Sequence, residues 1–351
     1  MTKDQQKLVY SEESRAKLEA EPVEITLGDV TLPLEHIDQN RLPNRFKTFR
    51  RIIAESETKE DWENVVRCLE GFEEAGIKAP SQWQELAIRK LNLVDMHHLI
   101  LKILQRPKAT GVRLSNLGVL QQVLRAVHDK AALADWAEEE TAKMYKQAKQ
   151  IVELMDNEEH HKGQKRPVKK GEVEVIEGDW RGKPSVVALP TEMAAVLAER
   201  YGGDKEEVKK LSNRLVNALK QSGYMVCCPT FFLQTRADTD KPFQTSLDMT
   251  SQRTTTTAAA FQNVTRQLAF LKDYCYELLE VLIVWNALKT SRKVLGAEMP
   301  MAEEAQKFEA RTEEVLMEGI GSLENMSKAK EGRSLKPAFV GYIKDALESC
   351  R

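Results

Sequence analysis

Residues 261–285 read FQNVTRQLAFLKDYCYELLEVLIVW, the most regular stretch of the chain. Its apolar side chains recur at alternating steps of three and four residues, which is a heptad pattern on a helix: Phe261, Val264, Leu268, Leu271, Cys275, Leu278, Leu282 and Trp285. Leu279 and Ile283 widen this apolar face, which favours a bundle helix with several neighbours over a two-stranded coil. An acidic helix over 302–326 follows a short turn at 296–300, and we expect it to fold back as an antiparallel partner.

Amphipathic patterns on both sides of this stretch predict further helices. Aromatic residues make up only 6% of the chain, and its 351 residues include 17 Gly and 12 Pro, which favours helices over strands and turns. The formal net charge of −2 excludes a uniformly basic nucleic-acid coat protein. We predict an all-α protein with further helices near 44–54, 62–75, 82–91, 96–105, 117–128, 132–155, 192–201, 205–221 and 336–349.

Changes in composition divide the chain into four parts. The linker is marked by five bases between Lys162 and Lys170, and its extended pieces at 172–176 and 185–189 could form a small hairpin before helices resume after Pro190. The expected parts are an N-terminal arm (1–40), a helical-repeat region (41–157), this basic linker (158–189) and a C-terminal helical bundle (190–351) containing a mobile, Thr-rich loop near 235–257.

Two segments of the predicted repeat region align with each other. LEGFEEAGIKAP (69–80) and LQRPKATGVRLS (104–115) place Gly76 and Gly111 35 residues apart, each followed by a β-branched residue and a base. Helix pairs of this period resemble the pentatricopeptide-repeat family, a tetratricopeptide-like class of helical repeats, here in a degenerate form over about 46–155. The resemblance implies an α-solenoid-like stack with a concave binding face, and a role in mitochondrial RNA metabolism or translation.

The basic residues of this region suggest what that face would bind. Bases cluster near the first helix and again at Lys102, Arg106, Lys108 and Arg113, where they could neutralise phosphates. Gln84 and Asn116 are the nearest matches to the family's base-reading positions. The leading prediction is a non-enzymatic adaptor that binds single-stranded RNA or a ribonucleoprotein, with contacts from Arg45, Arg50, Arg51, Gln84, Arg89 and Asn116.

Two alternatives remain open at this stage. A protein-binding scaffold or assembly factor would use the 261–285 helix for subunit contacts. An enzyme would need a polar pocket formed by 235–257. The repeat family implies a mitochondrial location, although the acid-rich N-terminus shows no presequence, so a cytoplasmic or nuclear location is the alternative.

The chain lacks the common motifs of catalysis and metal binding. The segment GDWRGKP (178–184) has three residues between its glycines where a phosphate loop needs four. Neighbours on a helix point about 100° apart, so neither His97-His98 nor His160-His161 presents two ligands on one face. The five cysteines form no CxxC pair. We therefore predict no catalytic residues, cofactor or metal, and no membrane span.

Overall fold

The computed structural model describes residues 3–21, 23–27, 30–38, 42–161, 179–221, 264–327 and 338–351. These residues belong to two compact units, Met1–Ser56 and Glu57–Arg351. Almost all of their regular structure is helical, and one short two-stranded sheet is the exception among them. The all-α prediction is confirmed. The stacking of the helices as a solenoid stays a prediction.

The N-terminal unit contains the only strands among the described residues. Helices α1 (Lys3–Tyr10) and α2 (Glu12–Ala20), which the sequence did not predict, precede β1 (Glu24–Leu27) and β2 (Val30–Pro33). The two strands pair antiparallel, with Glu24 opposite Pro33. Helix α3 (Arg45–Glu55) begins after Asn44, whose side chain accepts a hydrogen bond from the Lys47 N–H at 3.0 Å.

The second unit begins with seven helices. The sequence TKED (58–61) has the spacing of a helix-capping signal, a hydroxyl followed three residues later by a carboxylate, and Thr58 and Asp61 do form a capping box: Thr58 Oγ1 accepts from Asp61 N–H and the Asp61 carboxylate accepts from Thr58 N–H. These helices are α4 (Lys59–Glu74), α5 (Ser81–Leu93), α6 (His97–Gln105), α7 (Pro107–Thr110), α8 (Leu117–Leu133), α9 (Glu138–Leu154) and α10 (Glu158–His161).

Two features of this part differ from the prediction. Helix α6 ends at Gln105 as predicted, but the short helix α7 was not predicted; it starts at Pro107 because proline fits the first helical position, where no N–H partner is needed. The predicted helix over 132–155 is wrong at its start. Helix α8 continues to Leu133, and Asp135 and Trp136 then take positive φ angles that break the helix before α9.

The two glycines that define the predicted repeat adopt the same backbone conformation. Gly76 follows α4 with φ of +70°, and Gly111 follows α7 with φ of +69°. A left-handed residue at this place ends a helix, and glycine adopts it without a steric penalty. The repeat itself stays a prediction, since equal turns do not establish equal packing of the helix pairs.

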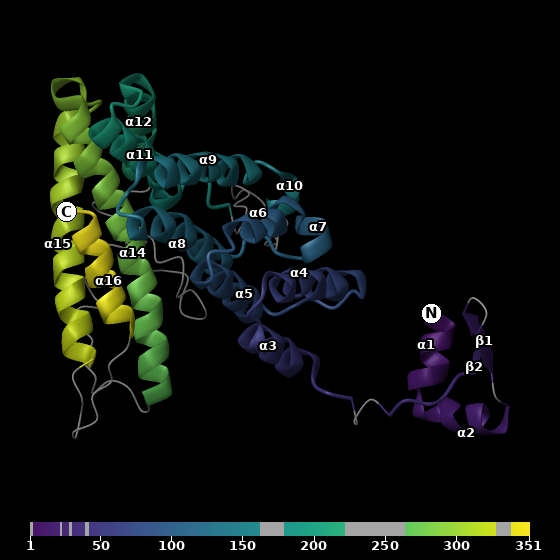
Figure 1. The fold of residues 1–351 in the computed structure, drawn as a ribbon. Coiled ribbons are helices and arrows are strands. Elements are labelled where there is room, and N and C mark those ends of the chain that lie inside the picture. The colour runs from purple at the N-terminus through teal and green to yellow at the C-terminus, as the bar shows by residue number, and fades with distance from the viewer. Residues whose placement is uncertain are drawn as a thin grey trace, which may run out of the picture. The chain divides into compact units, whose positions relative to one another are not determined.

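The C-terminal helices form a bundle around α11 and α14 (Figure 1). Helix α15 runs back along α14 as the predicted antiparallel partner, after a short 3₁₀ turn at Gly296–Glu298. The bundle comprises α11 (Pro184–Tyr201), α12 (Lys205–Gln221), α14 (Val264–Leu295), α15 (Ala302–Ser327) and α16 (Ala338–Ser349).

The heptad face of α14 is covered by the chain's own helices. Leu271, Cys275, Leu278 and Leu282 are fully buried, and Trp285 is 4% exposed. Helix α14 packs against both α11 and α15. From Leu271 to Trp285 the heptad face is thus buried inside the bundle and is not free to pair with another subunit, as the scaffold alternative required, whereas Leu268 is half-buried.

The predicted end of the linker is helical, which corrects the expectation of an extended piece at 185–189. Helix α11 begins at Pro184 and continues through Pro190, where proline costs about 3 kcal/mol. Every residue from 184 to 196 is buried, and the helix packs on α14, α12 and α9, so this burial offsets the cost. The rest of the predicted hairpin (162–178), the loop near 235–257 and Phe261 lie outside the described residues.

A buried polar network connects three helices of the second unit. The Asp129 carboxylate on α8 accepts hydrogen bonds from Asn92 of α5 at 3.0 Å, from Arg125 of α8 at 3.0 Å and from the Tyr342 hydroxyl of α16 at 2.5 Å. The Arg125 guanidinium also lies 4.1 Å from the centre of the Tyr342 ring. Helix α16 is thereby held to the helices of the predicted repeat region.

Candidate functional site

The predicted contact residues fall into both compact units. Arg45, Arg50 and Arg51 lie on α3 in the N-terminal unit, where all three are exposed. Arg51 forms an ion pair with Glu55 at 3.5 Å, one helical turn further on. Their side chains are accessible to a ligand, and their role in binding stays a prediction.

The other three predicted residues lie in the second unit, and two of them have local structural partners. Gln84 is 7% exposed on α5, and its amide donates to the carbonyl oxygens of Ala79 (3.2 Å) and Gly111 (3.4 Å). Asn116 caps α8 by accepting from the N–H groups of the first turn. Arg89 is half-buried on α5. The structure gives Gln84 and Asn116 these local roles, and their contact with RNA stays a prediction.

Most bases of the second predicted cluster are paired with acids. Arg106 forms an ion pair with Glu70 at 2.6 Å, and Lys108 lies 3.3 Å from Glu159. Arg113 contributes a longer pair with Glu73, at 3.8 Å, and donates to the Glu159 backbone carbonyl. These contacts connect α7 and the loop after it to α4 and α10, so the positive charge of the cluster is largely neutralised within the chain.

A groove of about 840 Å³ lies along α12, between this helix, α9 and α11. Its floor is partly apolar, since Val187, Pro190 and Leu211 line it. Its walls carry four bases against three acids, which are Lys149, Arg181, Lys210 and Arg214 against Glu153, Asp156 and Glu207. We refer to it below as the α12 groove.

The charges of the α12 groove are unevenly compensated. Lys149 lies 3.5 Å from Glu207, and Arg181 lies 3.1 Å from Asp156. Lys210 and Arg214 are exposed one turn apart on α12, and within the described ranges neither has an ion-pair partner. Among the described residues, the groove therefore has two positive charges without an ion-pair partner on the α12 face and one acid without such a partner, Glu153 of α9, so its lining has a net charge of +1.

Amide groups lie beside these two charges. Asn213 and Asn217 share the exposed face of α12, and Asn217 Nδ2 donates to Asn213 Oδ1 at 3.4 Å. Cationic side chains with neighbouring amides beside an apolar surface suit a flexible anionic polymer such as a single-stranded nucleic acid. Its phosphates would pair with the cations, and its sugars or bases would pack on the apolar residues. The sequence carries a signal for this surface, since positions 210, 213, 214 and 217 share one face of the predicted 205–221 helix, but the contact residues predicted from the sequence all lie between Arg45 and Asn116.

Comparison with known proteins adds the family. A family described as mitochondrial ribosomal protein mS27 matches residues 1–339. The chain belongs to the mS27 family. The small ribosomal subunit protein mS27 of Neurospora crassa is 22% identical over 222 residues, which cover 62% of this chain and 55% of that relative. The match thus spans about half the length of this curated relative.

Membership of the mS27 family decides between the predicted locations. It confirms the mitochondrial location and supports the ribosome-associated role in translation that was expected from the repeat resemblance. The cytoplasmic and nuclear alternatives are set aside. None of the described helices has an 18-residue window apolar enough to span a membrane.

Proposed function

We propose that this chain is a non-enzymatic helical component of the mitochondrial small ribosomal subunit that holds single-stranded RNA in the α12 groove. The observation that carries the proposal is the pair of uncompensated bases, Lys210 and Arg214, beside two amides above an apolar floor. Membership of the mS27 family supports it, since a ribosomal protein works next to RNA. The pentatricopeptide-like helices α4–α9 would serve as the scaffold that supports one wall of this groove.

A structural rather than catalytic role fits the polar groups of the groove. Glu207 and Asp156 are engaged with Lys149 and Arg181, so they are held as structural ion pairs. An acid–base catalyst needs a carboxyl group whose pKa is shifted toward neutrality by burial, and these carboxylates lie at an open surface. The predicted contacts Arg45, Arg50 and Arg51 remain candidates for a second RNA-binding surface in the N-terminal unit.

The test is binding of the full chain to a single-stranded RNA at 50 and 200 mM salt. Each phosphate neutralised on a single strand contributes about −0.7 to the slope of log K against log salt, so Lys210→Glu/Arg214→Glu should make the slope shallower by about 1.4. A matched control is Lys78→Glu/Lys307→Glu, which changes the net charge equally at two exposed lysines outside the groove. It should keep the slope of the unmodified chain.

Two results would contradict the proposal. One is the absence of RNA binding by the unmodified chain at 50 mM salt. The other is an equal loss of affinity in both double variants, which would show that only the net charge matters. Arg50→Glu/Arg51→Glu in the same assay reports separately on the predicted α3 contacts. Recovery of one stoichiometric protein partner after nuclease treatment, without RNA binding, would favour the scaffold alternative.

A further inference from the structure

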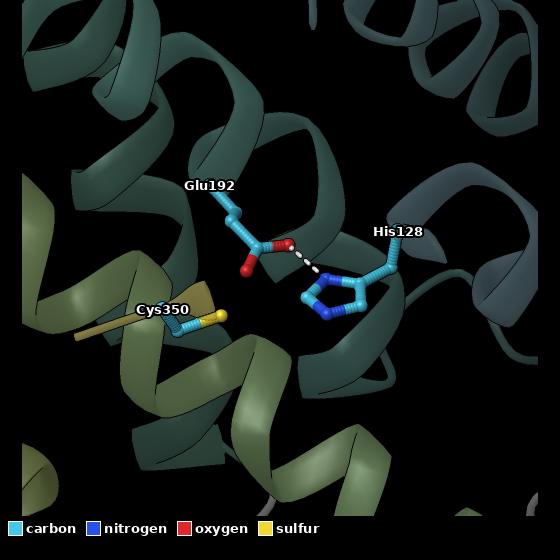
Figure 2. Close-up of side chains that lie close together, drawn as sticks. All are labelled: His128, Glu192 and Cys350. Carbon is cyan, nitrogen blue, oxygen red and sulfur yellow. Dashed lines mark hydrogen bonds and ion pairs between the residues drawn. The ribbon is translucent and has the colours of Figure 1, made fainter. Parts of the chain in front are cut away.

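Three side chains with metal-binding atoms meet in the interior of the second unit, away from the α12 groove. His128 of α8 and Glu192 of α11 are fully buried, and Cys350, just after α16, is 8% exposed. His128 Nδ1 lies 3.1 Å from a carboxylate oxygen of Glu192. One nitrogen, one oxygen and the sulfur of the three residues all lie within 4.8 Å of one another. Figure 2 shows the sulfur directed toward the space between the carboxylate and the ring.

The surroundings hold Glu192 in place but leave His128 incompletely satisfied. Asn286 Nδ2 donates to the second carboxylate oxygen of Glu192 at 2.7 Å, and Thr290 donates to Asn286 Oδ1 at 3.2 Å. The other ring nitrogen of His128, Nε2, is buried without a hydrogen-bond partner among the described residues. Burial lowers the pKa of His128, but the Glu192 carboxylate and the Cys350 side chain together raise it well above its ordinary value, so a metal ion that binds this ring has to displace a proton.

We propose that His128, Glu192 and Cys350 form a Zn²⁺ site that ties the C-terminal end of the described chain to α8 and α11. Imidazole nitrogen, carboxylate oxygen and thiolate sulfur are the three donor types that zinc takes in proteins. A thiolate ligand disfavours Mg²⁺ and Ca²⁺, which prefer oxygen donors. The two anionic ligands, the Glu192 carboxylate and the Cys350 thiolate, balance the charge of the ion in this buried place.

The separations fit a zinc ion after a small adjustment. Tetrahedral zinc with bonds of 2.0–2.3 Å holds its ligand atoms roughly 3.3–3.6 Å apart. The nitrogen–oxygen separation of 3.1 Å is already close to this range, and the widest separation of the three atoms is within 4.8 Å. A shift of the Cys350 sulfur by about an ångström would complete the triangle, and binding of the ion to the sulfur and to the ring nitrogen would displace the thiol proton and the ring proton to solvent.

A fourth ligand has room beside the cluster. A cavity of about 200 Å³ reaches the cluster at Cys350, Asn286 and Thr290, and its outer lining carries the bases Arg200, Lys289, Lys293 and Arg351 together with Glu199. This volume accommodates several water molecules. Three protein ligands with one position open to water form a known zinc arrangement. This site differs in place and in chemistry from the proposed RNA groove, so either proposal can fail without the other.

The test uses Co²⁺ as a spectroscopic probe of the full chain after removal of bound metal with a chelator. A cysteine-ligated cobalt ion gives a thiolate-to-cobalt charge-transfer band in the near ultraviolet. We expect one equivalent of Co²⁺ to bind, the band to be displaced by Zn²⁺, and Cys350→Ser to abolish it. The matched control is Cys275→Ser, which removes another buried thiol outside the cluster and should keep the band.

A second measurement covers a failure of the variant to fold. Circular dichroism establishes whether Cys350→Ser is folded, and the unfolding temperature of the unmodified chain is measured with and without one equivalent of Zn²⁺. The proposal predicts that Zn²⁺ raises this temperature in the unmodified chain. A folded, unmodified chain that binds no Co²⁺, or a charge-transfer band that persists in Cys350→Ser, would overturn it.

Discussion

The close packing of α15 on α14 makes a sharp prediction at Gly319. A β-carbon added there would lie inside van der Waals contact with Leu278 Cδ2, and only 3.1 Å from both Leu278 Cδ1 and the Tyr274 hydroxyl. Leu278 and Tyr274 are fully buried, so neither can move aside freely. Gly321 lies on the same helix, and no atom approaches within 4 Å of a β-carbon added there. The two glycines therefore form a matched pair.

The expected magnitude follows from two terms. Replacing either glycine by alanine gains about 1 kcal/mol of helix propensity. Overpacking at Gly319 costs about 1–3 kcal/mol, whereas Gly321 carries no such cost. The difference between Gly319→Ala and Gly321→Ala is therefore the overpacking term alone, about 1–3 kcal/mol.

Thermal unfolding followed by circular dichroism measures this difference. At roughly 2 °C per kcal/mol for a unit of this size, Gly319→Ala should unfold about 2–6 °C below Gly321→Ala. Gly321→Ala should be at least as stable as the unmodified chain. Equal unfolding temperatures of the two variants would refute the antiparallel packing of α14 against α15 in the register described.

Four further predictions concern other parts of the second unit. Asp129→Ala removes the carboxylate shared by Asn92, Arg125 and Tyr342 and should lower the free energy of unfolding by about 3–5 kcal/mol. The control is Glu139→Ala, which removes one partner of an exposed ion pair and should leave the unfolding temperature unchanged. Thr58→Ala should cost about 1 kcal/mol of stability and Thr58→Ser much less. The backbone N–H of Thr58 donates to the Asp61 carboxylate and lowers the pKa of Asp61 below its ordinary value of 3.8. The stability that Asp61 contributes is therefore present above pH 3.8 and is lost as the pH falls through the lowered pKa. In denaturant titrations, the free energies of unfolding of Asp61→Asn and of the unmodified chain should therefore converge as the pH falls. Burial raises the pKa of Cys275 to about 12, so only about 10⁻⁴ of this thiol is a thiolate at pH 8. After treatment of the native chain with an alkylating reagent, mass spectrometry should find Cys275 unmodified. Rapid alkylation of Cys275 would contradict its burial.

Much of the fold was readable from local patterns. The heptad of α14, the turn near Gly296 and the capping box at Thr58 all rest on spacings within a few residues, and these predictions are confirmed. The second half of α11 was predicted over 192–201, but its first half was missed because Pro190 normally ends a helix, and only the packing of distant helices around it offsets that cost. Local propensity does not contain this information.

The sites depended on contacts that local patterns do not contain. His128 and Glu192 are 64 residues apart in the sequence, and His128 belongs to neither of the two adjacent histidine pairs, His97-His98 and His160-His161. Gln84 was selected by analogy to repeat proteins, but burial turned its amide toward backbone carbonyls. The α12 groove exists only because α9 and α11 pack beside α12, and this packing brings charged residues from distant parts of the sequence together.

The most direct test of the central proposal is made on the intact ribosomal particle. Ultraviolet cross-linking of mitochondrial small ribosomal subunits that contain this chain, followed by mass spectrometry, identifies the peptides that carry RNA adducts. We predict adducts on α12, Lys205–Gln221, centred on the exposed face that carries Lys210 and Arg214. Subunits in which other peptides of this chain carry RNA adducts while α12 carries none would contradict the proposal.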